Sequence, residues 1–176
     1  MASQYRHKYG YERRGTLTGP GYDLLVILHV LSAVVGFGAV GVSGSYAARA
    51  RLAVRPREQE LLVRYFAPGT NWAERCLLVT PVLGAVVLVV GDRPAASQAW
   101  PWIGLGCWVV AAGISSSWCW PAERRVQAWL SGSSGALGAG DGISSFRDAC
   151  RAVELASLAI SVCFLGAVVV MIWQPG

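Results

Sequence analysis

The sequence predicts an all-α, polytopic membrane protein in which four transmembrane helices form an up-down bundle. Four stretches contain no Asp, Glu, Lys or Arg and only one histidine, His29. They cover residues 24–46, 76–91, 101–120 and 155–173. Roughly 20 helical residues, at about 1.5 Å per residue, cross a hydrocarbon core of about 30 Å. Because a charge inside that core costs several kcal/mol, we expect the charged residues in the connections.

The composition agrees with this class. Apolar residues make up 54% of the chain and charged residues 14%, which is unlike a soluble domain. The net charge of +5 comes from basic residues beside predicted helix ends, where Lys and Arg mark the cytoplasmic face. We therefore expect the protein to be embedded in a lipid bilayer and not to bind nucleic acid.

Aromatic residues delimit the elements in order. We expect a polar, basic tail over 1–21 and a four-helix transmembrane domain over 22–176. Its helices are expected at about 22–48, 70–91, 100–120 and 150–173. Tyr and Trp side chains, which favour the headgroup level, lie at both ends of these helices: Tyr22, Trp100, Trp102 and Trp173 at one face, and Tyr46, Trp72, Trp118 and Trp120 at the other. The first stretch follows polar residues and lacks a cleavage site, so we interpret it as a retained helix rather than a signal peptide.

The connections differ in character. Residues 56–66 predict a short amphipathic helix at the membrane surface, ended by Pro68 and Gly69. Residues 91–94 predict a tight turn. Residues 121–130 continue the third helix, and the Gly/Ser-rich segment 131–145 is typical of a flexible linker.

Charge asymmetry predicts the orientation. Loops 47–69 and 121–151 share one side of the membrane and carry nine arginines, whereas the N-terminal tail and the second connection together carry five basic residues. The positive-inside rule then places both loops in the cytoplasm and both termini outside a bacterial plasma membrane. The four basic residues of the tail argue in the opposite direction.

Small residues recur at helix-packing spacing. Pairs of Gly, Ala or Ser four residues apart let helix backbones approach closely in lipid. The candidate packing residues are Ser32, Gly36, Gly41, Gly44 and Gly113. They serve either packing within the bundle or docking of another subunit. Pro81 is expected to kink the second span.

His29 is the candidate intramembrane functional residue, because an ionisable group in a membrane span is by default a functional hypothesis. The alternatives are a neutral imidazole bonded to a neighbouring carbonyl or hydroxyl, a copper site with Cys107 and Met171, and a proton- or quinone-related role. Haem with two histidine ligands is disfavoured, because the second histidine, His7, lies in the tail.

Four charged residues form a second candidate set at the start of the rising helices: Glu74, Arg75, Arg151 and Glu154. We expect interfacial ion pairs, either Glu74 with Arg151 or Glu154 with Arg75, that join the second and fourth helices. A proton-conducting carboxylate is the alternative. The sequence contains no phosphate-binding loop, nucleophile–base pair or metal-spaced cluster, so we expect no enzyme, no metal and no cofactor.

Three segments carry a resemblance. LHVLSAVVGFGAVGVSGSYAA at 28–48, RYFAPGTNWAERCLLVTPVLG at 64–84 and WCWPAERRVQ at 118–127 resemble an uncharacterised bacterial family, of actinobacterial type, of four-helix integral membrane proteins with a domain of unknown function. The resemblance covers roughly 22–175. It implies the same fold and compartment and supplies no catalytic residues, and the long tail departs from the family's pattern.

Three functions are therefore expected, in this order. The first is a non-catalytic accessory or assembly subunit of a larger plasma-membrane complex, of which a respiratory complex is one example. The second is a redox or metal-handling protein (copper, haem or quinone) centred on His29. The third is a small transporter or channel.

Overall fold

The computed structural model describes residues 19–52, 56–67, 69, 71–91, 97–132 and 139–173. Most of the predicted tail over 1–21 lies outside these residues. The helices are α1 (Pro20–Leu52), α2 (Pro56–Tyr65), α3 (Trp72–Val90), α4 (Ala99–Ile114), a π-helical turn η3 (Ser115–Cys119), α5 (Trp120–Leu130) and α6 (Ala139–Trp173).

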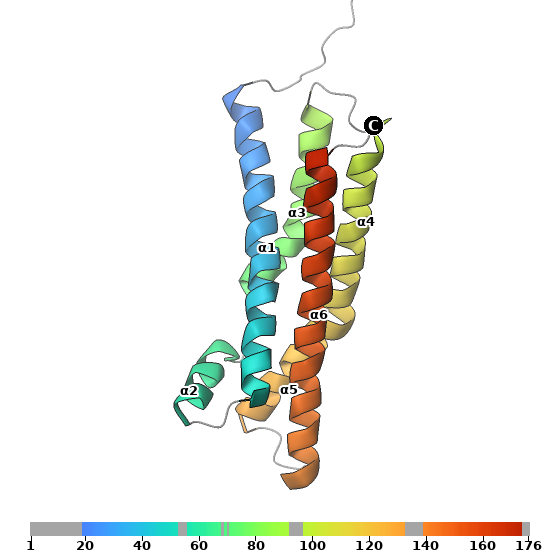
Figure 1. The fold of residues 1–176 in the computed structure, drawn as a ribbon. Coiled ribbons are helices and arrows are strands. Elements are labelled where there is room, and N and C mark those ends of the chain that lie inside the picture. The colour runs from blue at the N-terminus through green and yellow to red at the C-terminus, as the bar shows by residue number, and fades with distance from the viewer. Residues whose placement is uncertain are drawn as a thin grey trace, which may run out of the picture.

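Four helical segments are long and apolar enough to span a membrane: α1, α3, the continuous run from α4 through α5, and α6. They alternate in direction along the bundle (Figure 1). The predicted all-α, four-helix membrane fold is therefore confirmed. We call the end at which α1 finishes and α3 begins the basic end, because Arg49, Arg51, Arg75 and Arg151 lie there.

The interior mixes small side chains with a few large apolar ones, and the outer surface is rich in large apolar ones. Fully or almost fully buried positions include Ala47, Ala156 and Ser43 but also Leu77 and Ile160. Many other Leu, Val and Ile side chains, on all four spans, are exposed. This distribution suits lipid as the solvent, because small residues let helices pack closely while large apolar ones face acyl chains.

α1 packs against α3 and α6, and α6 packs against α4. Two glycines of α1 set the closest approaches. A Cβ at Gly36 would lie 2.5 Å from the backbone nitrogen of Leu77 on α3, and one at Gly44 would lie 2.5 Å from the Cβ of Ser157 on α6. Both positions therefore require glycine if the helices are to keep their present separation.

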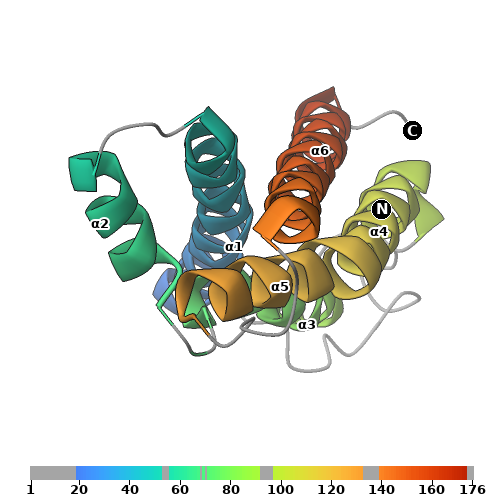
Figure 2. The same cartoon turned by 90° about the horizontal axis from the view of Figure 1, so that it is seen from below.

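The third span bends where α4 passes through η3 into α5. Pro121 has no amide hydrogen to donate within the helix, and its ring crowds the preceding turn. The wider π-helical turn ends two residues before this proline, and α5 then crosses the basic end beneath α3 (Figure 2).

α6 begins at Ala139, whereas the sequence predicts a linker over 131–145 and a helix from 150. Tertiary packing explains the longer helix. The ring of Phe146 stacks on Trp129 of α5 with centroids 4.2 Å apart, and Ala149 and Cys150 are buried. These contacts outweigh the weak helix propensity of the Gly/Ser-rich sequence.

Candidate functional site

A buried polar cluster lies at the basic end, where α1, α2, α3 and α5 meet. It consists of Ser43, Tyr65, Glu74 and Glu123, and we call it the carboxyl cluster. Glu74 is 1% exposed and Glu123 7% exposed. Carboxyl groups are almost never this buried unless they are paired, so their partners define what the cluster does.

A directed hydrogen-bond chain links three members of the cluster. The hydroxyl of Ser43 donates to Oε1 of Glu74 at 2.5 Å, and the hydroxyl oxygens of Ser43 and Tyr65 are 2.8 Å apart. Serine has one hydrogen to donate, so Tyr65 must donate to Ser43. Burial raises the pKa of the Tyr65 phenol, which keeps this donor protonated.

Glu123 completes the cluster from the first turn of α5. Its carboxyl group lies within interaction range of Glu74, Ser43 and Arg75. Glu123 and Glu74 both line the smaller cavity described below, so the two buried carboxyl groups lie near each other.

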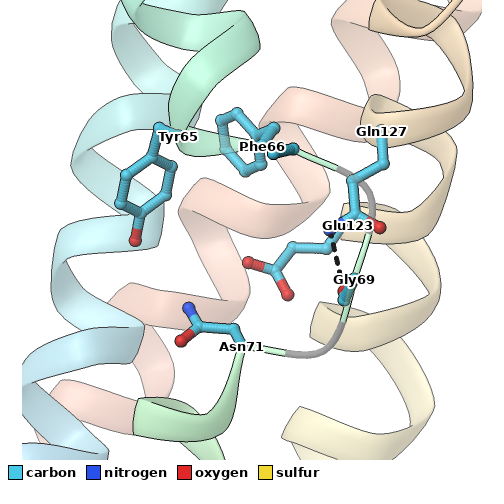
Figure 3. Close-up of a pocket in the computed structure, with 7 residues that line it drawn as sticks. Tyr65, Phe66, Gly69, Asn71, Glu123 and Gln127 are labelled. Atoms are coloured by element: carbon cyan, nitrogen blue, oxygen red, sulfur yellow. Dashed lines mark hydrogen bonds between the residues drawn. The ribbon is translucent and has the colours of Figure 1, made fainter.

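A cavity of about 270 Å³ adjoins Glu123. Its lining comprises Tyr65, Phe66, Ala67, Gly69, Asn71, Glu123 and Gln127. The Glu123 carboxyl group points into the space between Tyr65, Phe66 and Asn71, and Gln127 Nε2 donates to the Gly69 carbonyl at 3.5 Å (Figure 3).

A smaller cavity of about 80 Å³ shares part of this lining. Glu74, Arg75, Trp120 and Arg124 add to its wall. The Arg75 guanidinium lies 3.5 Å from the centroid of the Trp120 ring, a cation–π contact that holds this cation at the edge of the cluster. The Trp120 Nε1 atom is buried and has no hydrogen-bond partner among the described residues.

His29 lies away from the carboxyl cluster, between α1 and α3. Its Nδ1 is 2.9 Å from the carbonyl oxygen of Thr80, so Nδ1 carries the hydrogen. Ser32 donates to the His29 carbonyl at 2.7 Å and lies 3.2 Å from the Thr80 hydroxyl. Gly84 leaves room for the ring, because a Cβ there would lie 3.0 Å from His29 Cε1. This contact is the carbonyl-bonded imidazole expected as the structural alternative.

The structure does not bring together the three residues considered as copper ligands, His29, Cys107 and Met171. Met171 packs near Gly104 of α4, whereas His29 contacts Thr80 of α3. Within the part of the chain that the structure describes, no three His, Cys, Asp or Glu side chains are grouped to hold a metal ion.

The predicted interfacial ion pairs need correction. Glu154 pairs with Arg51 of α1 at 3.1 Å and not with Arg75, which lies on Trp120. Glu74 bonds to Ser43 instead of Arg151, whose side chain is exposed. The reason is that α5 crosses beneath the first turn of α3 and separates it from the start of α6.

The predicted packing residues divide into three groups. Ser32 and Gly36 face α3, as their contacts with Thr80 and Leu77 show. Gly41 and Gly44 face α6, near Ser161 and Ser157. Gly113 does not pack within the bundle, because no described atom lies within 4 Å of a Cβ built there.

Sequence reasoning missed Ser43, Tyr65 and Glu123. Ser43 belongs to a stripe of small residues that indicates only packing, and Tyr65 and Glu123 lie in connections expected at the membrane surface. The one available signal is that Glu123 follows the predicted third span by three residues, close to the level of Glu74.

A comparison of the chain with protein-family models, curated proteins and solved structures finds no match in any of the three. The functional argument therefore depends on the geometry of this chain alone.

Proposed function

We propose that the protein is a non-catalytic accessory subunit that docks onto another plasma-membrane protein through one face of α4. A respiratory complex is one assembly of this kind. The observation that supports the proposal is a pair of exposed glycines on α4, Gly106 and Gly113, with no described atom within 4 Å of a Cβ built at either.

The face consists of Gly106 and Gly113 of α4 with Ser117 of the adjoining η3, and we call it the α4 face. The spacing of seven residues places the two glycines on one side of α4. All three residues are exposed, and no described atom lies within 4 Å of a Cβ built at Gly106 or Gly113. Gly104, on another side of α4, instead contacts Met171 of α6.

Two features favour a helix as the occupant of the α4 face. Elsewhere in the chain, buried glycines mark close helix contacts, as Gly36 and Gly44 do, and small residues are the usual interface residues in lipid. The Ser117 hydroxyl also donates to the Gly113 carbonyl at 2.6 Å. The face thus presents little unsatisfied polar surface to an apolar partner helix.

We place the basic end in the cytoplasm and the start of α1 outside. The support is the concentration of arginines at that end, including Arg49, Arg64, Arg124 and Arg147, because cytoplasmic ends carry the excess of Lys and Arg.

The test is affinity purification of the full chain from its native membranes in mild detergent, followed by native electrophoresis and identification of co-purifying proteins. We expect a complex larger than a dimer of this chain. Gly106→Leu with Gly113→Leu should release the partner, because the new side chains fill the α4 face.

The matched control is Gly38→Leu, which places the same bulk on an open, exposed position of α1 and should retain the partner. Migration of the wild type only as a monomer or homodimer would contradict the proposal. Retention of the partner by the double variant would contradict the assignment of the face.

A further inference from the structure

The larger cavity is separate from the α4 face, because none of its lining residues belongs to that face. It opens at the basic end, where Ala67 and Gly69 of its wall are exposed. The Glu123 side chain extends into this space toward Tyr65 and Asn71 (Figure 3). A ligand that enters the cavity therefore meets a carboxyl group.

Glu123 has no ion-pair partner among the described residues. Its side chain is 7% exposed, and carboxyl groups this buried are normally paired. The ion pair of the described chain joins Arg51 to Glu154. Arg75, which lines the smaller cavity together with Glu123, lies on the Trp120 ring instead. A buried carboxyl group at a cavity wall is thus left without a counter-ion from the described part of the chain.

The wall of the larger cavity differs in charge from its surroundings. Arginines are concentrated at the basic end, and Arg64 and Arg124 are two of them. The described wall of the cavity contains Glu123 and neither Lys nor Arg. An anion that enters would be repelled by a carboxylate there, whereas a cation would be attracted. The cavity therefore favours a positively charged ligand.

The uncharged part of the wall favours an organic cation. It consists of the rings of Tyr65 and Phe66 and the side-chain amides of Asn71 and Gln127. Aromatic faces attract ammonium groups, and amide oxygens accept their hydrogen bonds. A water molecule takes about 30 Å³ of liquid volume, so about 270 Å³ exceeds the needs of one bare ion and accommodates a few carbon atoms as well.

The aromatic side of the cavity is held in place by contacts within the chain. Tyr65 stacks on Tyr46 with ring centroids 4.0 Å apart and meets Phe66 edge-on at 5.1 Å. The Tyr65 hydroxyl also bonds to Ser43 at 2.8 Å, and Phe66 is buried. A wall that is already ordered lowers the entropic cost of binding.

We propose that the larger cavity binds a small organic ammonium ion. The ammonium group pairs with the Glu123 carboxylate, and the carbon atoms lie against the rings of Tyr65 and Phe66. The binding is non-covalent, so no bond is made or broken and no electron is transferred. The amino headgroup of a lipid and a free amine share this chemistry.

The test uses calorimetry on the full chain in detergent at about pH 8, where an ordinary carboxyl group is ionised. The probe is ethanolamine as its ammonium ion, and the matched neutral compound is ethylene glycol, which has the same number of non-hydrogen atoms. We expect ethanolamine to bind. Ethylene glycol should bind weaker by about tenfold or more, because it lacks the charge that pairs with the carboxylate.

Variants localise the site. Glu123→Gln keeps the size of the side chain, removes its charge and should weaken ethanolamine binding by about tenfold or more. The control is Glu154→Gln, which changes a carboxyl group at the same end but outside both cavities and should leave the affinity unchanged. Thermal melts show whether each variant keeps its fold.

A second variant decides the question if Glu123→Gln unfolds. Asn71 lines the larger cavity, and its side chain makes no capping hydrogen bond at the start of α3. Asn71→Phe therefore adds bulk to the cavity without removing a helix cap or the carboxyl group, and it should also abolish binding.

Three outcomes would overturn the proposal: no binding of ethanolamine, equal affinity for ethylene glycol, or unchanged affinity in both Glu123→Gln and Asn71→Phe. None of these measurements depends on retention of a partner at the α4 face. Nanodiscs distinguish the two sources of the cation. Weaker ethanolamine binding in phosphatidylethanolamine than in phosphatidylglycerol assigns the site to a lipid headgroup, and equal binding assigns it to a free amine.

Discussion

The indole Nε1 of Trp108 donates a hydrogen bond to the carbonyl oxygen of Leu77 at 2.8 Å. That carbonyl is the one whose helical donor is missing, because Pro81, four residues later, has no amide hydrogen. The side chain of α4 thus supplies the donor that the proline removes from α3. This bond joins two helices that otherwise make few contacts.

Trp108→Phe should therefore destabilise the bundle by about 1–2 kcal/mol, since it leaves a carbonyl unsatisfied. In a Pro81→Ala background the amide of residue 81 supplies the donor to the Leu77 carbonyl. Trp108→Phe should therefore lower the free energy of unfolding by less than it does in the wild type. Equilibrium unfolding of the four proteins in mixed detergent measures the coupling. Equal costs of Trp108→Phe in the two backgrounds would show that Trp108 does not compensate for the proline.

Gly36→Ala should destabilise the bundle by about 1–3 kcal/mol, because the added methyl group meets backbone atoms of Leu77 that cannot move alone. Gly38→Ala is the matched control two residues away. Nothing described lies within 4 Å of its Cβ, and the gain in helix propensity should leave stability unchanged or slightly higher. Equal effects of the two substitutions in the same unfolding assay would contradict the close contact between α1 and α3.

Ser43→Ala should cost about 1–3 kcal/mol, because it removes the donor to buried Glu74 and the acceptor for Tyr65 together. Ser45→Ala is the control. The Ser45 hydroxyl is exposed and donates to the Gly41 carbonyl of its own helix, so its loss should change stability little. A small effect of Ser43→Ala would indicate that the carboxyl cluster is not held by this serine.

Tyr65 should give the stability a dependence on high pH. Burial raises its pKa in the folded state above the ordinary value of 10.0, so the folded protein keeps a proton that the unfolded chain loses. Stability due to this group is therefore full below about pH 10 and falls as the pH rises toward the folded-state pKa. Between about pH 9 and 11, the free energy of unfolding should fall less steeply with pH in Tyr65→Phe than in the wild type. An equally steep fall in Tyr65→Phe would show that Tyr65 is not the group responsible.

The partner of Glu154 can be identified by double-mutant cycles. Arg51 and Glu154 are each about one-third exposed, so their coupling should be modest, about 0.5 kcal/mol. Cycles of Glu154→Gln with Arg51→Gln should show it, while cycles with Arg75→Gln should not. Coupling to Arg75 alone would restore the pairing expected from sequence.

Sequence patterns predicted the spans well because they depend on local properties. Hydropathy identified all four segments, and the exposed rings of Trp72 and Trp173 lie at span ends as expected. The start of α6 is not predicted, because Gly and Ser favour a linker over a helix. The stacking of Phe146 on Trp129, which extends the helix, is a tertiary contact that local propensity does not indicate.

The carboxyl cluster was beyond sequence reasoning for a related reason. Glu74 is a sequence candidate, yet its partner Ser43 lies 31 residues before it, and Glu123, which lines the same cavity, comes far after it in the chain. Their meeting depends on the bend before Pro121, which directs α5 beneath α3. No helical periodicity within a single segment indicates that crossing.

The most direct test of the account is the membrane sidedness of the two ends of the bundle. In a variant whose native cysteines are replaced by alanine, single cysteines at Arg64, Arg125 and Gln98 would be labelled with a membrane-impermeant maleimide in right-side-out and inverted vesicles. Four spans predict that the Arg64→Cys and Arg125→Cys proteins react from the same side and the Gln98→Cys protein from the other. Reaction of Arg64→Cys and Arg125→Cys from opposite sides would contradict the four-helix membrane fold.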